Sequence, residues 1–413
     1  MVRVAVMAIG SRGDVAPFTG LGVRLREAGH EVTIASHAVF EPLIRRHALG
    51  FHLLPMDAQE QLQTRFADRG LTRMTIAVNQ MIAENARPLA EAMLEAARAA
   101  DVLLVTPPSW FAAVIAEGLG IPSIGVYLQP LTPTREFPPA ALTARSLGGW
   151  ANYRVAHLLL TVAQRPFRSV VEGLRAELGL PAASPSAWLS SLEARQWPIL
   201  YGYSPLVVPV PPDWPAWYRP VGYFHPAPEP DFAPAPELER FLAAGPPPVY
   251  IGFGSMPVRD RDALSALLVT AARTAGVRAI VSAGWAGLTA DAEDVLAVGE
   301  VPHEWLFPRM AAVVHHAGAG TSAAALRAGV PQVPVPVMVD QPFWAKRLDR
   351  LGVTPGPIPM RKLRAQRLAE ALKAATTDPR YRERAQALAA ALAKEDGAGA
   401  VLREVARVTS GAA

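Results

Sequence analysis

The segment from His315 to Thr321 (HHAGAGT) combines residue types that can bind phosphate. Gly318 and Gly320 let the backbone approach a ligand closely, and a helix that begins here presents free N–H groups and a partial positive charge. Thr321 adds a hydroxyl donor, and His316 can donate to an anionic oxygen. The segment therefore predicts a phosphate-binding turn; the structural alternative is that its glycines only permit close packing of a helix on a strand.

The same glycines also fit a dinucleotide fingerprint. Gly318, Gly320 and Ala323 form G-x-G-x-x-A, and Asp340 follows 20 residues after Gly320. Two histidines precede the glycines, however, and they lie late in the chain. Asp340 is also followed directly by residues 341–343 (QPF), which open a helix. An NAD(P)-dependent oxidoreductase that uses Gly318, Gly320 and Asp340 stays the alternative.

Asp340 and Gln341 are expected where a parallel strand ends, the edge at which α/β sheets bind ligands. A carboxylate beside an amide can accept from and donate to neighbouring hydroxyls, as on a sugar ring. Asp340 can also cap the helix that follows, and capping does not exclude contact with a ligand.

Asp14 follows the first strand at the equivalent edge of its sheet and is a candidate general base. A carboxylate within hydrogen-bond reach of an alcohol promotes the attack of that alcohol by ~10²–10⁴-fold. The alternative is an N-terminal helix cap close to Pro17. Arg12 can balance a departing diphosphate or hold Asp14 as an anion, or it is a solvated loop residue.

These residues depend on alternating strands and helices. Apolar, β-branched runs predict strands, and helical spacing of apolar residues, with Pro17 in a first turn, predicts the helices between them. A long helical stretch is expected between residues 59 and 100. In the N-terminal half we expect strands at 2–9, 31–36, 101–106 and 122–127, with a helix at 110–119 after the first helix, which ends at Gly29.

A Pro-rich stretch divides the chain, and the alternation restarts after it. We expect an N-terminal domain (1–204), an interdomain linker (205–246), a second α/β domain (247–395) and a C-terminal helix that packs back on the first domain (396–413). In the second half the expected strands are 249–254, 278–282, 295–298, 312–315 and 332–339, and the expected helices are 261–275, 321–328, 343–351, 364–376, 380–394 and 398–409.

Three segments carry a resemblance to a known family. HHAGAGTSAAALRAGVPQVPVPVMVDQPFWAKRL resembles the donor-site signature of family 1 glycosyltransferases, and is most similar to their bacterial antibiotic and sterol-glucosyltransferase branch. The first loop (GSRGDV) and the C-terminal EDG before a helix resemble the same branch. The resemblance covers both ends of the chain and is weak over about 55–210. It implies the α/β GT-B fold, in which two Rossmann-like domains face each other across a deep cleft. In this fold the N-terminal domain (1–204) would bind the acceptor and the second domain (247–395) would bind the nucleotide sugar.

The resemblance also implies roles for individual residues. Asp14 would be the general base, and Asp340 and Gln341 would bind sugar hydroxyls. Val301, Pro302 and His303 would meet the nucleobase, although plant-type members carry Gln where His303 stands. The donor pyrophosphate would be held by Arg12, Ser255, His316, Gly318, Ala319, Gly320 and Thr321.

The implied reaction is an inverting, metal-independent transfer of a hexose from a UDP- or dTDP-sugar to a hydroxyl, with no further cofactor. Aromatic and Met residues of the first half suggest a lipophilic acceptor, such as a polyketide, macrolide or sterol-like alcohol. Trp110, Tyr127, Phe137 and Met81 are the candidates for its pocket, and each also fits ordinary core. A third alternative is a non-catalytic auxiliary protein that keeps the fold. Uracil or thymine, the sugar, O- or C-transfer and the oligomeric state stay open.

Composition excludes several other classes. The chain has 413 residues, of which 51% are hydrophobic and 18% charged, so it is not disordered. It contains no Cys, which removes disulfides and thiolate chemistry, and no apolar run long enough to span a membrane. No basic stripe interleaved with aromatics indicates a nucleic-acid partner. Asp260 and Asp262 form D-x-D, but a helix cap is favoured over a metal site. We expect a cytoplasmic protein.

Overall fold

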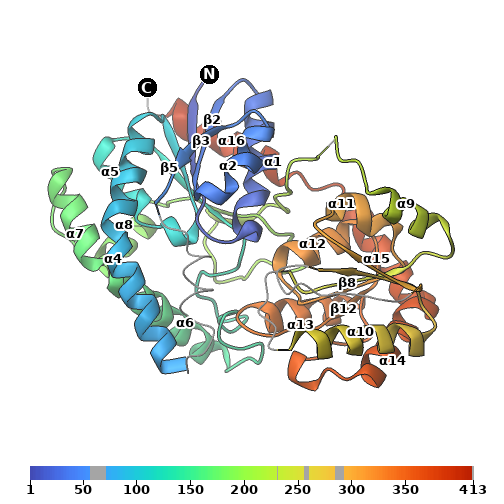
Figure 1. The fold of residues 1–413 in the computed structure, drawn as a ribbon. Coiled ribbons are helices and arrows are strands. Elements are labelled where there is room, and N and C mark those ends of the chain that lie inside the picture. The colour runs from blue at the N-terminus through green and yellow to red at the C-terminus, as the bar shows by residue number, and fades with distance from the viewer. Residues whose placement is uncertain (56–70, 230, 255–259, 284–292, 412–413) are drawn as a thin grey trace.

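The computed structural model describes residues 1–55, 71–229, 231–254, 260–283 and 293–411. The side chains of residues 71–84 are outside the description, and so is Ser255, one of the residues expected at the pyrophosphate. Within the described residues, two α/β domains are built on separate parallel sheets, which confirms the predicted fold class (Figure 1).

The N-terminal sheet has seven strands in the order β3-β2-β1-β4-β5-β6-β7, and every pairing is parallel. Strand β1 (Arg3–Met7), which lies between β2 and β4, sends alternate side chains to opposite faces. Val4 and Val6 pack in one apolar cluster, and Ala5 and Met7 pack in another. The remaining strands are β2 (Glu31–Ser36), β3 (Gly50–Leu53), β4 (Val102–Val105), β5 (Ser123–Tyr127), β6 (Ile199–Tyr201) and β7 (Tyr218–Pro220).

Helices cover both faces of this sheet, as a doubly wound fold requires. α1 (Arg12–Glu27) contributes Phe18 and Leu21 to the cluster that holds Val4 and Val6. α4 (Leu71–Arg98) contributes Leu89 to the opposite cluster. The other helices of this domain are α2 (Glu41–Arg46), α5 (Ala112–Leu119), α6 (Gly149–Gln164), α7 (Arg168–Glu177) and α8 (Pro185–Ala194).

The C-terminal sheet has five parallel strands in the order β10-β9-β8-β11-β12. They are β8 (Val249–Gly252), β9 (Ala279–Ser282), β10 (Val295–Val298), β11 (Ala312–His315) and β12 (Gln332–Pro334). The helices are α9 (Pro236–Ala243), α10 (Arg261–Ala275), α11 (His303–Leu306), α12 (Ala319–Arg327), α13 (Gln341–Leu351), α14 (Ala365–Thr377), α15 (Pro379–Leu392) and α16 (Gly397–Ser410). Short 3₁₀ turns occupy Ala38–Phe40, Pro107–Ser109, Arg165–Phe167, Phe307–Arg309 and Met360–Lys362.

The chain crosses between the domains in two places. The Pro-rich stretch at 205–246 is more than the expected linker: it contains β7, which pairs with β6 (Ile199 opposite Tyr218), and α9. The second crossing follows α15. Val401 and Val405 of α16 are buried beside the N-terminal sheet, next to α1 (Figure 1).

Several expected boundaries differ from the structure by a few residues, and two of these differences have a clear local reason. α1 begins at Arg12, so Pro17 lies in its second turn. The helix starts earlier because Ser11 is the N-cap residue and Asp14 bonds back to it. β12 stops at Pro334, whereas we expected the strand to reach residue 339. Proline has no N–H to extend a ladder, and Val339 takes a left-handed φ of 55°.

Candidate active site

Asp14 is held in the first turn of α1, just beyond the carboxyl end of β1. Its Oδ2 atom accepts hydrogen bonds from the backbone N–H and the hydroxyl of Ser11, both at 2.8 Å. Burial raises the pKa of this carboxyl, and the two bonds from Ser11 oppose that rise. Asp14 is therefore a half-buried carboxylate held in place by the capping box that it forms with the N-cap residue Ser11.

Gly10 shapes the backbone around this carboxylate. It has a φ of 137°, and a Cβ atom there would lie 2.5 Å from Asp14 Oδ2 and 2.8 Å from Asp14 Cγ. We expect Gly10→Ala to displace Asp14 and to cost about 1–3 kcal/mol of unfolding free energy. Turnover by the variant, measured at a temperature where it is folded, should fall at least about tenfold, in line with the general-base contribution. Wild-type turnover would show that the loop tolerates the side chain.

The phosphate-binding turn predicted from the sequence joins β11 to α12. Ala317 adopts a φ of 65°, and Gly318 is the N-cap residue of α12. The first amides of a helix have no intrahelical partner, so Ala319, Gly320 and Thr321 present N–H groups at this end. Gly320 is exposed, and a Cβ atom added there would meet nothing within 4 Å. The backbone is thus open to a ligand at Gly320.

His316 lies beside this turn in space that two glycines leave free. Added Cβ atoms at Gly254 and Gly318 would lie 3.1 Å and 2.5 Å from the ring of His316. Burial lowers the pKa of His316 to about 4, so the ring is neutral near pH 7. Its Nδ1 atom is buried without a hydrogen-bond partner among the described residues. A buried polar atom of this kind is a candidate ligand contact.

His315 supports the turn from behind and does not contact the ligand side. Its side chain is 0% exposed; Nε2 lies 2.8 Å from Gln332 Oε1, and Nδ1 accepts from the N–H of Ala317 at 3.1 Å. Since Nδ1 accepts, the proton is on Nε2, and burial lowers the pKa of His315 to about 3. The two adjacent histidines therefore have different roles.

The segment expected at the nucleobase begins α11. Val301, Pro302 and His303 are half-buried, and the ring of His303 stacks on Phe307 at 4.3 Å with 14° between the planes. Tyr250 meets the same ring edge-on at 5.8 Å. Burial, followed by the charges of Arg12 and His316, lowers the pKa of His303 to about 4.

Because His303 is neutral in the folded protein, we expect the stability of the protein to depend on pH. The pKa of His303 in the folded protein lies below the ordinary 6.5. The contribution of neutral His303 to the free energy of unfolding is therefore complete above pH 6.5 and is lost as the pH falls toward 4. Phe at this position keeps the stack on Phe307 but cannot be protonated. We therefore expect His303→Phe to show a shallower fall of Tm between pH 6.5 and 4 than the wild type. Parallel Tm profiles would contradict the assignment.

Asp340 and Gln341 sit at the start of α13, and each has a structural partner. Asp340 Oδ2 accepts from Trp344 Nε1 at 2.8 Å, and Gln341 Oε1 accepts from the amides of Val337 and Met338 at 2.8 and 3.1 Å. Burial raises the pKa of Asp340, and the negative charge of Asp14 raises it further. The structure thus holds Asp340 and Asp14, from different domains, within electrostatic range of each other.

Arg12 forms ion pairs that join the loop after β1 to the C-terminal half of the chain. Its guanidinium pairs with Glu300 of the C-terminal domain at 3.2 Å and with Glu229 at 3.8 Å. Arg12, expected at the diphosphate or beside Asp14, is therefore paired with carboxylates of the facing segments. Glu300 and Trp344 are partners that the sequence analysis missed; Trp344 had a signal, since it is one helical turn from Asp340.

The acceptor candidates are separated from one another. Trp110 packs against Phe111, Phe167 and Trp188, and Tyr127 packs edge-on against Tyr201 at 5.8 Å. Phe137 is buried between Trp214 and Phe343, at the contact between the domains. The side chain of Met81 lies outside the described residues. These contacts place Phe137 in the interdomain core, and half-buried Tyr127 packs against that core. Trp110 packs instead against the cluster of the N-terminal domain that holds Leu89.

The carboxylates and histidines of the described residues do not gather into a metal site. The described part of the chain holds no group of three or more His, Asp or Glu that could bind a metal ion. Asp260 caps α10, since its Oδ1 accepts from the N–H of Ala263 at 2.9 Å. Among the helices described, none combines the length and apolarity that crossing a bilayer requires.

The chain matches two protein-family descriptions. Residues 4–138 match the glycosyltransferase family 28 N-terminal domain, and residues 275–407 match the erythromycin biosynthesis protein CIII-like, C-terminal domain. Among solved structures, the glycotransferase of kitacinnamycin aligns over 98% of both chains with a TM-score of 0.73 at 19% identity. Glycosyltransferase VinC, in complex with dTDP, aligns over 99% of both with a TM-score of 0.67 at 20% identity. These likenesses show the GT-B fold.

Curated relatives have a higher sequence identity to this chain than these solved structures do. O-mycaminosyltylonolide 6-deoxyallosyltransferase of Streptomyces fradiae is 35% identical over 409 residues, covering 96% of this chain and 95% of the relative. Sterol 3-beta-glucosyltransferase UGT80B1 of Arabidopsis thaliana is 33% identical over 97% of this chain, which spans 67% of that enzyme. The chain spans only 26% of the sterol 3-beta-glucosyltransferase of Debaryomyces hansenii. The chain belongs to the family 1 glycosyltransferases of the GT-B fold.

Proposed function

We propose that this glycosyltransferase moves a hexose from a UDP- or dTDP-sugar to a hydroxyl of a lipophilic acceptor, a polyketide, macrolide or sterol-like alcohol, in the cytoplasm. The named acceptors of the relatives support this class: one relative is a tylonolide glycosyltransferase and another a sterol glucosyltransferase. Neighbours in complex with dTDP or thymidine diphosphate support a nucleoside-diphosphate donor. Family membership displaces the oxidoreductase alternative.

One observation carries the proposal: a carboxylate of one domain and an open helix N-terminus of the other come together. Helix α1, which carries Asp14, contacts α12, whose first residues form the phosphate-binding turn. Arg12 pairs with Glu300 of the C-terminal domain at 3.2 Å, and the charge of Asp14 raises the pKa of Asp340. The loops that end β1, β11 and β12 therefore meet. A donor held at one side can be attacked from the other.

The proposed reaction is a single displacement. Asp14 takes the proton of the acceptor hydroxyl as its oxygen bonds to the anomeric carbon. The bond from that carbon to the diphosphate oxygen breaks at the same time, and attack from the face opposite the leaving group inverts the anomeric centre. The departing negative charge goes to the amides of residues 319–321 and to His316, while Asp340 and Gln341 orient the sugar hydroxyls. Gln341 can reach a sugar only by exchanging its present contacts with the 337–338 amides.

A thermal-shift panel tests the donor class. UDP, dTDP and their sugars bind only the native state, so the correct nucleotide raises Tm in a concentration-dependent way. ADP and NAD(H) serve as controls, because a shift with NAD(H) alone would overturn the proposal. A single-turnover assay with the preferred donor separates an enzyme from a non-catalytic auxiliary protein, which would bind nucleotide without forming product.

Metal removal gives a further expected result. Because helix amides and a neutral histidine receive the leaving group, we expect the initial rate to be unchanged after treatment with EDTA. The measurement is turnover before and after chelation, with Mg²⁺ and Mn²⁺ added back. Loss of turnover that either ion restores would contradict the metal-independent mechanism.

A further inference from the structure

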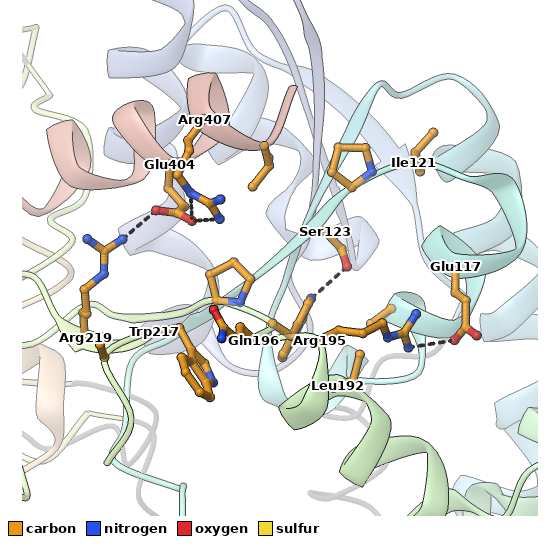
Figure 2. A pocket seen from close by; sticks show the side chains of 16 residues that line it. Glu117, Ile121, Ser123, Leu192, Arg195, Gln196, Trp217, Arg219, Glu404 and Arg407 are labelled. Carbon is orange, nitrogen blue, oxygen red and sulfur yellow. Dashed lines mark hydrogen bonds and ion pairs between the residues drawn. The ribbon is translucent and has the colours of Figure 1, made fainter. Parts of the chain in front are cut away.

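A cavity of about 580 Å³ lies on the N-terminal domain, away from the loops described above (Figure 2). It opens where the N-terminal strands begin: its wall includes Ser123, the first residue of β5, Pro198 just before β6, and Trp217 just before β7. Asp14 and the phosphate-binding turn follow the opposite, carboxyl ends of strands. A second cavity of about 610 Å³ adjoins the first and shares Ala216 and Arg219 with it.

Two ion-pair groups face each other across the first cavity (Figure 2). On one side, Glu404 of α16 pairs with Arg219 and with Arg407, both at 2.6 Å. On the other side, Glu117 of α5 pairs with Arg195 at 3.3 Å and with Arg175 at 3.5 Å. Arg175 is buried and does not line the cavity. The lining therefore holds three guanidinium groups, those of Arg195, Arg219 and Arg407, and two carboxylates, which leaves an excess of one positive charge.

The arginines keep donors that these pairs do not use. Arg195, Arg219 and Arg407 are each about half exposed or more, at 50%, 47% and 64%. Arg219 reaches Glu404 through one Nη atom, and Arg407 does so through Nε and one Nη. A guanidinium group has five N–H donors, so N–H groups remain for an anion.

Apolar side chains line much of the surface between the two groups. Side chains of Ile121, Leu192, Trp197, Trp217 and Val408 line it. Trp197 donates its indole N–H to Ser123 Oγ at 2.9 Å, so its polar atom is satisfied and its ring is left for contact. The volume lies in the range of small-molecule pockets, which are typically about 300–1,000 Å³.

We propose that this cavity is a second ligand site, separate from the transfer site, for an amphipathic organic anion. Its occupant has an apolar, preferably aromatic body against Trp197, Trp217 and Leu192, and an anionic group such as a carboxylate, sulfonate or phosphate monoester at Arg195 or Arg407. Neither part is sufficient alone: the arginines supply charge-assisted hydrogen bonds, and the apolar wall supplies burial.

The probe for this site is 8-anilinonaphthalene-1-sulfonate, an aromatic body with one sulfonate whose fluorescence rises on binding. We expect saturable binding to the full-length protein, with the Kd raised about tenfold in Arg195→Gln and in Arg407→Gln, since each removes a charge-assisted contact. Arg380→Gln, which alters an exposed arginine of α15, is the matched control and should leave the Kd unchanged.

A third variant keeps the ion pairs and fills the space. Ala216 is exposed and lines both cavities, so Ala216→Trp should fold normally and abolish this binding component. Neutral N-phenyl-1-naphthylamine and inorganic phosphate separate the two requirements, and neither should compete strongly. dTDP and UDP should not displace the probe. Equal probe affinity in the wild type, Ala216→Trp and Arg407→Gln, or displacement by nucleotide, would overturn the proposal without touching the proposed function.

Discussion

Replacement of Asp14 by Asn is expected to lower kcat by about 10²- to 10⁴-fold, the range that a general base contributes. An amide cannot take the proton of the acceptor hydroxyl. The structure gives this carboxylate one engaged oxygen, Oδ2, bonded twice to Ser11, and leaves the Oδ1 atom for a proton. Initial rates at saturating donor and acceptor are the measurement.

The variant should fold and should bind donor normally. Asn presents one carbonyl oxygen, which can accept the same two bonds from Ser11 and so preserve the start of α1. Tm and nucleotide affinity are therefore expected to stay near the wild-type values. Ser11→Ala is the companion variant: it removes one of the bonds but keeps the base, and a smaller loss of kcat is expected. Asp14→Asn with near wild-type turnover would remove Asp14 from the mechanism.

The second large effect is expected at His316. Its Nδ1 atom is buried without a partner among the described residues, and the ring is neutral because burial lowers its pKa to about 4. If Nδ1 carries the ring proton, it can donate a hydrogen bond to a diphosphate oxygen, which accepts it. We expect His316→Ala to raise the Kd for the preferred nucleoside diphosphate by about 10- to 100-fold, the value of a hydrogen bond to a charged group.

Adjacent His315 supplies the comparison. His316→Ala removes a buried, unpaired nitrogen, so its Tm should change little, whereas His315→Ala breaks the contact with Gln332 in a fully buried position and should lower Tm. Calorimetric titration and thermal unfolding of both variants separate binding from folding. Unchanged nucleotide affinity in His316→Ala would place the diphosphate elsewhere.

Local pattern was enough to predict much of the fold. The strand expected at 31–36 has the same bounds as β2, and the helix expected at 261–275 has the same bounds as α10. In each case the pattern that predicts the element lies within the element itself. Boundaries failed where a side chain acted across the element's end: Asp14 bonding to Ser11 starts α1 before the position that Pro17 suggested. Asp14 takes part in the capping of α1, one of the two roles that the sequence left open, and its role as general base stays a prediction.

Contacts between distant segments had no local signal. Arg12 pairs with Glu300 across the domain boundary, and Phe137 packs on Phe343; each pair depends on how the two domains meet. The cavity at the edge where the N-terminal strands begin is formed by the starts of β5 and β7 together with α16, which comes from the C-terminal end of the chain. The different environments of His315 and His316 also come from segments distant in sequence. Gln332 contacts the ring of His315, whereas Gly254 and Gly318 flank the ring of His316.

A crystal structure with bound dTDP or UDP would locate the diphosphate. We expect the β-phosphate within hydrogen-bond distance of the amides of Gly320 and Thr321 and of His316 Nδ1, and the base next to residues 301–303. A nucleotide whose phosphates contact none of residues 316–321 would contradict this expectation.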